Sequence, residues 1–412
     1  MNGPIMKEIS SSESFVKVLH VVRSLKRGGG VQGWLVECLK RIDSNDVRID
    51  FLTLNNQVGY FEELSESNSR VFCCNNHHKI IFFLREIYHI FKENKYDIVH
   101  SHCEYLDGII LSVAKACNIP VRISHAHTNV SVEYSLRNLK NTLWQVLSTK
   151  LILNNATSGV SVSQLSGRNF FGKAWGKIEN FGGTLPCGID LKPFTVPLPA
   201  KQFLNVSEIP HNYKIFGNVA RFCTPKNHEF ILDIINETIK IDKNVRFVFV
   251  GDGELKNKIE SLSLMRGIDK YIIFLGARDD VPFLLRKYVD VFLFPSKSEG
   301  LGLALIEAQA AGLPCLYSNV IPSEVAIIPD LCHSLPLDNN PKVWAEKLLF
   351  ISRNKPAISL KDNLFRLFTS KYNIEISVKN LIEYYMAAIE AANCRCLNSG
   401  KAVEKHSCKK RK

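Results

Sequence analysis

The segment VFLFPSKSEGLGLALIE, Val291–Glu307, predicts a strand, a loop and the start of a helix. Its apolar run stops at Pro295, a polar turn and two glycines follow, and the last residues have a helical pattern. A helix start leaves backbone N–H groups unpaired, and glycines let a ligand approach the backbone closely. The segment therefore predicts an anion site between two acids, Glu299 in the loop and Glu307 in the helix, whose carboxylates can stand roughly 12 Å apart.

The chain of 412 residues is too long for one ordinary core and predicts two domains of about 150–200 residues each. Apolar residues make up 46% and charged residues 22%, which is typical of globular proteins rather than of disordered or fibrous ones. The formal net charge of +12 favours an acidic partner, which leaves nucleic acid, an anionic bilayer and a phosphorylated substrate as candidates.

Two absences in the sequence bear on localisation. Met1–Phe15 has no apolar core of signal-peptide length, and no run reaches the roughly 18 apolar residues that cross a bilayer. The twelve cysteines are scattered, without two pairs at zinc spacing. We therefore expect reduced cysteines in a cytoplasmic protein.

Apolar runs alternate with helical patterns along the chain. The first run, Val16–Val22, leads into the glycine loop Ser24–Gly30, which lacks the G-x-G-x-x-G spacing of a dinucleotide site. Pro197–Asn212 holds three prolines and little periodicity, so we expect the linker between the domains there. The pattern starts again with the strand Tyr213–Val219, which predicts parallel sheets covered by helices on both faces.

Two cations follow the strand that opens the second half. Arg221 and Lys226 lie five residues apart in this loop, where basic side chains are suited to a diphosphate. A solvated charged loop is the alternative interpretation.

Four histidines follow two predicted strands of the first half: His100, His102, His125 and His127. Open α/β sheets bind their ligands at the carboxyl ends of strands, which favours contacts with substrate or with neighbouring loops. A metal cluster is the alternative, but no carboxylate or cysteine is spaced to complete a tetrahedral set. We therefore predict no metal site.

The stretch Val132–Lys150 predicts a helix with an apolar stripe made by Leu136, Leu139, Leu143, Trp144 and Leu147. Such a helix either lies in the interface of an anionic bilayer or covers the sheet of its own domain. We favour the helix that covers the sheet.

Four segments of the second half carry a family resemblance: GNVARFCTPKN, VFVGDGELKNKIE, IIFLGARDDVPFLL and DVFLFPSKSEGLGLALIEAQAAGLPC. In this order they resemble the C-terminal half of the family 4 glycosyltransferases, which are retaining, nucleotide-sugar-dependent enzymes of the GT-B fold. The glycine loop Arg27–Gly30, YDIVHSH and IPVRISHAH resemble the branch that builds bacterial capsular polysaccharides and exopolysaccharides. The resemblance covers roughly Val16–Glu383.

The resemblance implies an α/β chain of the GT-B fold, with two Rossmann-like domains that face each other across a cleft. Residues 1–195 would bind the acceptor, and residues 196–375 would bind the nucleotide sugar. A helix at about 376–392 would cross back to the first domain, and residues 393–412 would form a basic tail.

The resemblance also implies roles for single residues of the second domain. Glu307 would accept hydrogen bonds from the donor ribose, and Glu299 would lie near hydroxyls of the donor sugar. Arg221 and Lys226 would hold the diphosphate and balance charge on the leaving group. Backbone N–H groups would add to this clamp from Gly300, Leu301, Gly302 and Leu303.

Further implied contacts come from both domains. Gly276 and Arg278 would lie by the base, for which uracil is expected. Gly29 and Gly30 would face the diphosphate from the first domain.

The implied reaction is glycosyl transfer with retention at the anomeric carbon, near which either His125 or His127 would lie. No residue matches a carboxylate nucleophile on the far face of the donor, so the two-carboxylate glycosidase scheme does not transfer. Same-face attack is expected, in which the departing phosphate helps to deprotonate the acceptor, without a cofactor or a divalent metal.

We therefore predict a glycosyltransferase that moves a sugar from a nucleotide-sugar donor, expected to be a UDP-sugar, to a lipid-linked or oligosaccharide acceptor. The product would belong to capsule, exopolysaccharide or O-antigen biosynthesis. The enzyme would work in the cytoplasm, with peripheral contact to the anionic inner face of the cell membrane and without a nucleic-acid partner.

Two other functions are weaker alternatives. A non-hydrolysing sugar-nucleotide epimerase has a related fold, but the segment EGLGLALIE with its paired glutamates argues against that function. A non-catalytic nucleic-acid-binding protein would cluster its basic residues with aromatics on one face, and this sequence spreads them.

Two positions depart from the family pattern. Cys187 stands where Asn is frequent before Gly-Ile-Asp, and the glycine loop reads Gly30-Val31-Gln32 where Gly-Gly-x-Glu is common. The glycine loop would lie at the cleft, so its departure from the family pattern bears on the contacts implied for Gly29 and Gly30.

Overall fold

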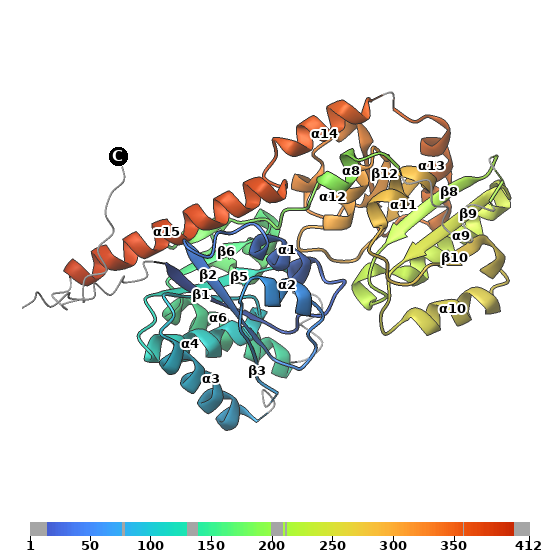
Figure 1. Cartoon of the computed structure of the whole chain (residues 1–412). Helices are drawn as coiled ribbons and strands as arrows, with labels where there is room; N and C mark the ends of the chain where they lie inside the picture. The colour runs from blue at the N-terminus through green and yellow to red at the C-terminus, as the bar shows by residue number, and fades with distance from the viewer. Residues whose placement is uncertain are drawn as a thin grey trace, which may run out of the picture.

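The computed structural model describes residues 15–75, 79–129, 139–198, 209–210, 212–356 and 358–398. These residues form two α/β domains, each with a parallel sheet between layers of helices (Figure 1). The predicted fold class is confirmed, because each half has the doubly wound arrangement of a Rossmann-like domain.

The first domain has a seven-stranded sheet in the order β3-β2-β1-β4-β5-β6-β7. Its strands are β1 Val16–Val22, β2 Val47–Thr53, β3 Val71–Cys73, β4 Ile98–Ser101, β5 Val121–Ala126, β6 Ser158–Ser161 and β7 Phe181–Thr184. The helices are α1 Gly30–Leu39, α2 Phe61–Glu66, α3 Ile80–Asn94, α4 Asp107–Ala116, α6 Leu139–Asn155 and α7 Gln164–Phe171. The short helix α8 Lys192–Thr195 follows them in the chain and lies against the second domain (Figure 1).

The second domain has a six-stranded sheet in the order β10-β9-β8-β11-β12-β13. Its strands are β8 Lys214–Val219, β9 Val245–Val250, β10 Ile272–Phe274, β11 Val291–Phe294, β12 Cys315–Ser318 and β13 Cys332–Leu335. The helices are α9 His228–Ile241, α10 Lys256–Met265, α11 Val281–Tyr288, α12 Leu303–Ala310, α13 Pro341–Arg353 and α14 Leu360–Phe368.

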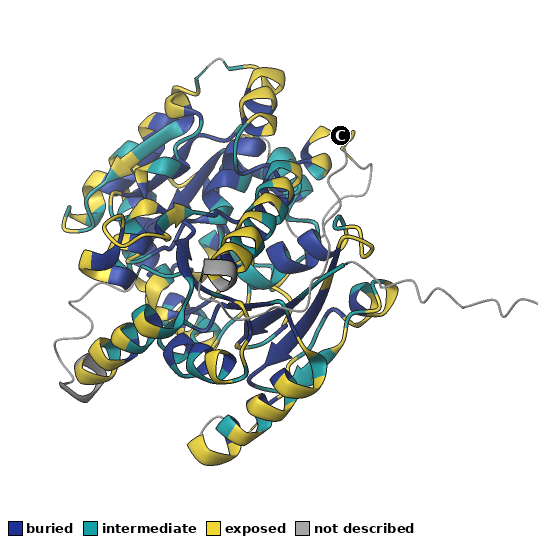
Figure 2. Ribbon diagram, turned by 90° about the vertical axis from the view of Figure 1, so that its left-hand side faces the viewer, coloured by how far each residue is buried: buried dark blue, intermediate teal, exposed yellow. Residues whose placement is uncertain are grey.

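The central strands are apolar on both faces because helices cover both sides of each sheet. In β9, the sequence VRFVFV has only Arg246 outside the fully buried class, and Phe247 and Phe249 fill the core. Figure 2 shows the same layering, with buried strands inside and exposed residues on the outer faces of the helices.

Helix α15, Ile374–Asn398, returns from the second domain and lies along the first (Figure 1). Trp34 of α1 donates to Ser377 Oγ at 3.0 Å, and Tyr384 donates to Ser158 Oγ at 2.7 Å. The helix continues to Asn398, so the predicted start of the tail at residue 393 lies inside it.

Three predicted segments fall wholly or partly outside the described residues. They are most of the linker at 197–212, residues 132–138 of the predicted helix, and residues 399–412 of the predicted tail.

The prediction that the helix at 132–150 covers the sheet with its apolar stripe is wrong for the part that the structure describes. Leu143 is 63% exposed and Leu147 is 53% exposed, and Trp144 is also exposed. The helix α6 packs on α4, where Ser148 lies against Gly108, and its fully buried Ile152 packs in a cluster with Phe170 and Phe171. Leucines at helical spacing predict that a helix has an apolar face, but they do not predict which surface packs against that face.

Among the described residues, no helix combines the length and the apolar character needed to span a bilayer.

Candidate active site

Both sheets reverse their strand order at one point, and the predicted site residues follow the strands that flank these points. In the second domain the reversal lies between β8 and β11, and in the first it lies between β1 and β4. Open α/β sheets bind ligands in the crevice that forms beyond the carboxyl ends of such strands. The topology therefore gives the loops after these four strands the position of a shared binding site.

The loops after β8 and β11 meet through Lys226 and Glu299. Lys226 Nζ lies 2.5 Å from Glu299 Oε1, and the ammonium also lies 5.3 Å from the centre of the Phe294 ring. Glu299 is only 8% exposed, so its charge is held in a largely desolvated place by one cation. The predicted phosphate ligand Lys226 thus already neutralises the predicted sugar ligand Glu299.

Arg221 differs from Lys226 in being exposed and unengaged. Its side chain makes no hydrogen bond or ion pair within the described part of the chain. An exposed guanidinium in a crevice loop can take an anion in a bidentate manner without first breaking an internal contact.

Two glycines that follow β9 fix the backbone around Arg221. Gly251 has φ +140°, and a Cβ on it would come within 2.0 Å of the Ala220 carbonyl oxygen. The Phe222 amide donates to the Asp252 carbonyl at 3.0 Å. This GDG turn belongs to the segment VFVGDGELKNKIE that carries the family resemblance, but its contact with the Arg221 loop was not predicted. Glycines after a strand are the signal for such a close approach.

Helix α12 begins beside this loop and carries Glu307. Gly302 caps it with φ +96°, a left-handed conformation that favours glycine. Glu307 has no hydrogen-bonding partner for its carboxylate in the described residues, and desolvation raises its pKa to about 7. A partly buried carboxylate without donors is suited to accept hydrogen bonds from a pair of ligand hydroxyls.

The starts of two helices meet across the domain boundary. A Cβ on Gly30, the first residue of α1, would come within 3.0 Å of Leu303 Cδ1, at the first residue of α12. At these positions both helices have unpaired backbone N–H groups and the positive ends of their dipoles. The structure thus brings the predicted residues Gly30 and Leu303 together.

The domains are also in direct contact at Gly300. A Cβ on Gly300 would lie 1.8 Å from the His127 carbonyl oxygen, and Ser163 donates to the Gly300 carbonyl at 2.7 Å. His125 is fully buried, whereas His127 is partly exposed at this boundary. Of the two histidines predicted near the anomeric carbon, His127 is therefore the one beside the loop of Glu299.

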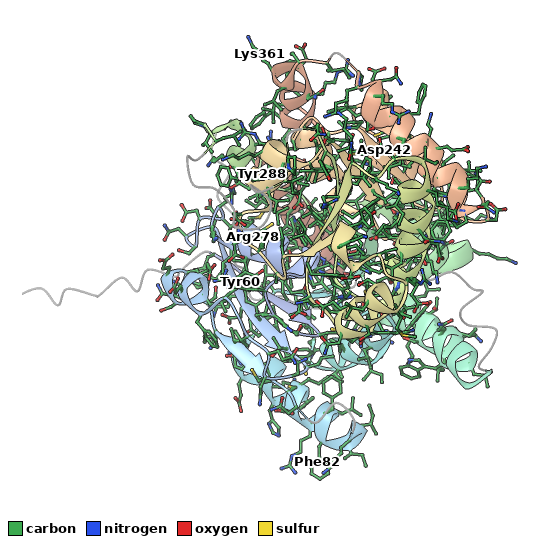
Figure 3. All side chains as sticks on the ribbon, turned by 90° about the vertical axis from the view of Figure 1, so that its right-hand side faces the viewer. Tyr60, Phe82, Asp242, Arg278, Tyr288 and Lys361 are labelled. Atoms are coloured by element: carbon green, nitrogen blue, oxygen red, sulfur yellow. The ribbon has the colours of Figure 1, made fainter. Side chains whose placement is uncertain are left out.

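Gly276 and Arg278 lie in the loop after β10. The Gly276 carbonyl accepts from the Gly251 amide at 2.8 Å, and its φ of +69° is left-handed. Arg278 makes two hydrogen bonds to Asp280, at 2.7 and 2.6 Å, which raise the pKa of the guanidinium. Figure 3 shows Arg278 on the second domain and Tyr60 on the first, and burial together with charges that include Asp279 of this loop raises the pKa of the Tyr60 hydroxyl.

Two family models match the chain, Glycosyltransferase Family 4 over residues 28–191 and Glycosyl transferases group 1 over residues 200–363. The chain is also 33% identical over 337 residues to EpsF of Bacillus subtilis (strain 168), and the match covers 81% of this chain and 86% of EpsF. The chain belongs to the family 4 glycosyltransferases. The predicted family is confirmed.

Other known proteins resemble this glycosyltransferase over most of its length. CapH of Staphylococcus aureus, a capsular polysaccharide biosynthesis glycosyltransferase, is 26% identical, with 90% of this chain and 99% of CapH covered. An Escherichia coli UDP-Gal:alpha-D-GlcNAc-diphosphoundecaprenol alpha-1,3-galactosyltransferase is 27% identical, with 74% and 78% covered. The structure of Anabaena HepE with UDP and glucose superposes with a TM-score of 0.69 at 14% identity, covering 90% of this chain and 100% of HepE.

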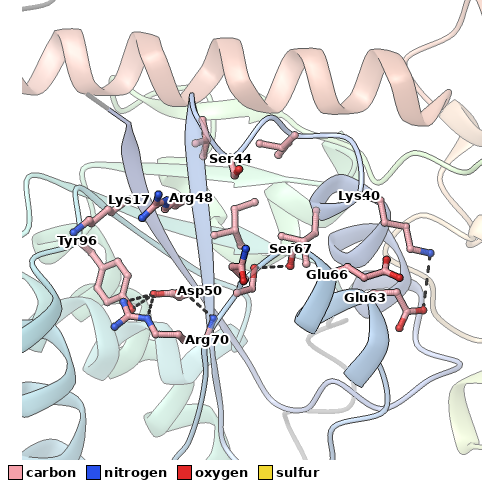
Figure 4. A pocket seen from close by; sticks show the side chains of 16 residues that line it. Lys17, Lys40, Ser44, Arg48, Asp50, Glu63, Glu66, Ser67, Arg70 and Tyr96 are labelled. Atoms are coloured by element: carbon pink, nitrogen blue, oxygen red, sulfur yellow. Dashed lines mark hydrogen bonds and ion pairs between the residues drawn. The ribbon is translucent and has the colours of Figure 1, made fainter. Parts of the chain in front are cut away.

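A hollow of about 860 Å³ lies elsewhere on this glycosyltransferase, at the amino ends of β1 and β2 (Figure 4). Its buried acid, Asp50, already accepts from Arg70 at 2.6 Å and from Tyr96 at 2.7 Å. Parallel sheets place their chemistry at the carboxyl ends of the strands, and this acid is fully occupied. Despite its size, the hollow is therefore not the candidate active site.

The predicted strand-end histidines of the glycosyltransferase form one buried cluster with two further residues, His20 and Tyr385. The parallel register of β1 and β4 places His20 opposite His100. No sequence pattern singles out His20, because one histidine inside an apolar strand is indistinguishable from an ordinary core residue. Tyr385 lies 285 residues from His100 in the chain and reaches it only because α15 crosses back.

Proposed function

We propose that this glycosyltransferase transfers a sugar from a nucleotide-sugar donor, expected to be a UDP-sugar, with retention of the anomeric configuration. The observation that carries the proposal is the set of unpaired groups at the ends of helices and loops where the two domains meet. Arg221 and the N-termini of α1 and α12 can receive a diphosphate, while Glu307 can receive the ribose hydroxyls. The structure of HepE with UDP and glucose supports the same class of ligand.

The geometry of the charged groups supports a metal-free reaction. The acceptor hydroxyl attacks the anomeric carbon from the face that the diphosphate leaves, a new C–O bond forms, and the C–O bond to phosphate breaks. The hydroxyl proton passes to the departing phosphate oxygen. Arg221 and Lys226 offset the charge on that oxygen, and Glu299 keeps Lys226 in place at 2.5 Å.

For the acceptor we propose a lipid-linked or oligosaccharide substrate in capsule, exopolysaccharide or O-antigen biosynthesis. CapH acts in capsular polysaccharide biosynthesis, and the Escherichia coli relative uses a diphosphoundecaprenol acceptor. The partly exposed His127 at the domain boundary would contact the acceptor hydroxyl.

We further propose that the first domain holds this enzyme on an anionic bilayer through α3 and α6. Phe82 is 61% exposed and Ile81 is also exposed, as are Leu143 and Leu147 of α6. Figure 3 shows Phe82 at the end of the first domain that points away from the second. An apolar hollow joins the two helices across α4, lined by Ile80, Leu84, Tyr88, Ile109, Val113 and Leu151.

Cations accompany this apolar face. Lys79, Arg85 and Lys92 of the α3 region are exposed, as is Lys150 of α6. Apolar side chains beside basic ones are the composition of a surface that lies in the interface of an anionic membrane.

The test of the transfer reaction uses purified protein, a panel of nucleotide sugars and a short diphospho-lipid sugar acceptor. Growth of the acceptor by one sugar, with an α-linkage from an α-linked donor by NMR, is the expected result. An inverted linkage overturns retention, and an isomerised donor without transfer points to an epimerase. Activity lost in EDTA and restored by manganese would contradict the metal-free reaction.

A further inference from the structure

Five histidines and one tyrosine in the first domain form a single unbranched chain of hydrogen bonds. The order of its members is His125, His100, Tyr385, His20, His102, His127. Its links measure 3.1 Å for His125 Nδ1 to His100 Nε2, 2.8 Å for His100 Nδ1 to Tyr385 Oη, and 3.1 Å for Tyr385 Oη to His20 Nε2. The last two measure 2.8 Å for His20 Nδ1 to His102 Nε2 and 2.7 Å for His102 Nδ1 to His127 Nε2.

All six members of the chain are uncharged at neutral pH. Burial lowers the pKa of His20 and of His127 to about 3 and lowers the pKa of the other three histidines well below the ordinary value. Burial likewise raises the pKa of the Tyr385 hydroxyl. Trp34 covers the chain from α1, with its ring edge-on to His125 at 5.8 Å.

Counting protons leaves only two arrangements for such a chain. A neutral imidazole has one N–H and one lone pair, and a tyrosyl hydroxyl donates once. Every hydrogen bond in the chain therefore has one donor and one acceptor only if all the bonds donate toward the same end of the chain. Because Nε2 lies toward the His125 end and Nδ1 toward the His127 end in every histidine, the five imidazoles are then either all Nε2–H or all Nδ1–H.

The end of the chain at His127 decides between these arrangements. Beyond His127 Nδ1 lies the thiol of Cys187, with its sulfur at 3.9 Å, and burial raises the pKa of that thiol so that it keeps its proton. At the other end, His125 Nε2 has no hydrogen-bonding partner among the described residues. Because the Cys187 thiol keeps its proton, it can donate to a lone pair on His127 Nδ1, which favours the all-Nε2–H arrangement.

We propose that this chain fixes the tautomer of His127 with a lone pair on Nδ1, where the acceptor hydroxyl would replace the Cys187 thiol as the hydrogen-bond donor. Tyr385 is then a positioning residue that acts from the crossing helix, through His20 and His102. The role at the acceptor rests on the proposed function, whereas the tautomer itself does not.

The distances favour hydrogen bonds over metal ligation in this cluster. Two groups of three histidines have nitrogens within 4.8 Å of one another, one comprising His20, His100 and His102 and the other His102, His125 and His127. Zinc–nitrogen bonds of about 2.0–2.1 Å in a tetrahedral site separate ligand nitrogens by roughly 3.3 Å. The links of 2.7 and 2.8 Å on both sides of His102 are shorter than that separation.

The tautomers are measured directly by two-bond ¹H–¹⁵N correlation spectra of protein labelled with ¹⁵N-histidine, with single His→Gln variants for assignment. Five imidazoles that remain neutral and Nε2-protonated from pH 5 to 8 are the expected result. A mixture of Nε2–H and Nδ1–H forms among the five overturns the proposal. So does ligation of added zinc by these histidines at micromolar concentration.

Tyr385→Phe and Tyr384→Phe form a matched pair, because the two tyrosines are neighbours on α15 and Tyr384 donates to Ser158 outside the chain. Tyr385→Phe should mix the tautomers of His20, His102 and His127. It should also lower kcat about tenfold at unchanged donor KM, on the scale of one lost hydrogen bond. Tyr384→Phe should do neither.

Equal effects of the two variants overturn the positioning role. If instead no donor is consumed by the wild-type enzyme while the five Nε2–H signals are present, the proposed function fails and the tautomer assignment stands.

Discussion

Lys226 Nζ and Glu299 Oε1 lie 2.5 Å apart, and they join two loops that follow neighbouring strands of the second sheet. A donor diphosphate would meet an ammonium that already has a counterion. In the proposed reaction Lys226 would act on the leaving group as one half of a pair, so its effect on catalysis should depend on Glu299.

Lys226→Met removes this counterion and leaves Glu299 charged in a largely buried position. We expect kcat/KM to fall by about 100-fold or more, as for the loss of a group that stabilises a leaving anion. Lys297→Met is the control, because Lys297 is an exposed cation of the same loop region, and it should change kcat/KM less than about twofold.

A double-mutant cycle tests the coupling between the two residues. Glu299→Gln combined with Lys226→Met should lose less activity than the sum of the single changes, with a coupling energy of about 1–3 kcal/mol. Strict additivity would show that the two side chains act independently.

Glu307→Gln tests the ribose contact through its pH dependence. The pKa of the Glu307 carboxyl is raised to about 7, so donor affinity in the wild-type enzyme should strengthen from pH 6 to pH 8 as the carboxylate forms. The glutamine variant should bind the donor more weakly at pH 8 and lack this pH dependence. Calorimetric titration at both pH values measures it, with Glu346→Gln on the exposed side of α13 as the control.

The same group also affects stability. Its folded-state pKa of about 7 lies above the ordinary value of 4.5, so the folded protein keeps a proton that the unfolded chain has lost. This carboxyl therefore makes the free energy of unfolding fall as pH rises from about 4.5 to about 7. In Glu307→Gln, thermal unfolding measured from pH 4.5 to pH 7 should show a smaller decrease in the free energy of unfolding than in the wild-type protein. The same decrease in both proteins would contradict the raised pKa.

Gly300→Ala tests the contact between the domains. Its Cβ would lie 1.8 Å from the His127 carbonyl oxygen, so the Glu299 loop or the end of β5 must shift. We expect a loss of about 1–3 kcal/mol in the free energy of unfolding, together with strongly reduced transfer. Gly183→Ala would meet only ordinary contact at 3.8 Å and should remain within about 0.5 kcal/mol of wild type.

Phe82→Asp and Leu147→Asp test the membrane face. Each places a charge on the apolar surface of α3 or α6, and each should reduce cosedimentation with vesicles that contain phosphatidylglycerol. Met265→Asp is the control, because Met265 is 82% exposed but lies on α10 of the second domain. Equal binding of all three variants, or equal binding to neutral vesicles, would contradict the proposed surface.

The sequence predicted the parts of this structure that depend on local patterns. Apolar runs such as Val16–Val22 and Val245–Val250 became buried strands, because a parallel sheet covered on both faces needs uninterrupted apolar residues. The loop residues Arg221, Lys226 and Glu299 lie at the carboxyl ends of strands, as that topology requires.

Partners that depend on long-range packing were not predictable in the same way. The pairing of Lys226 with Glu299 spans 73 residues, and the contacts of Tyr385 with two histidines depend on the path of one helix. The apolar stripe of α6 could be predicted from its periodicity, but the surface that contacts it could not. The periodicity of an apolar helix face is the same whether that face packs on protein or on lipid.

The return of α15 to the first domain has a consequence for exchanging parts between relatives. Tyr385, Tyr384 and Ser377 all bond to residues of the first domain, although they come after the whole second domain in the chain. A chimera made by joining one enzyme's acceptor half to another's donor half at a single junction would bring a foreign helix onto these contacts. Acceptor preference should move intact between relatives only when residues 374–398 are transplanted along with residues 15–198.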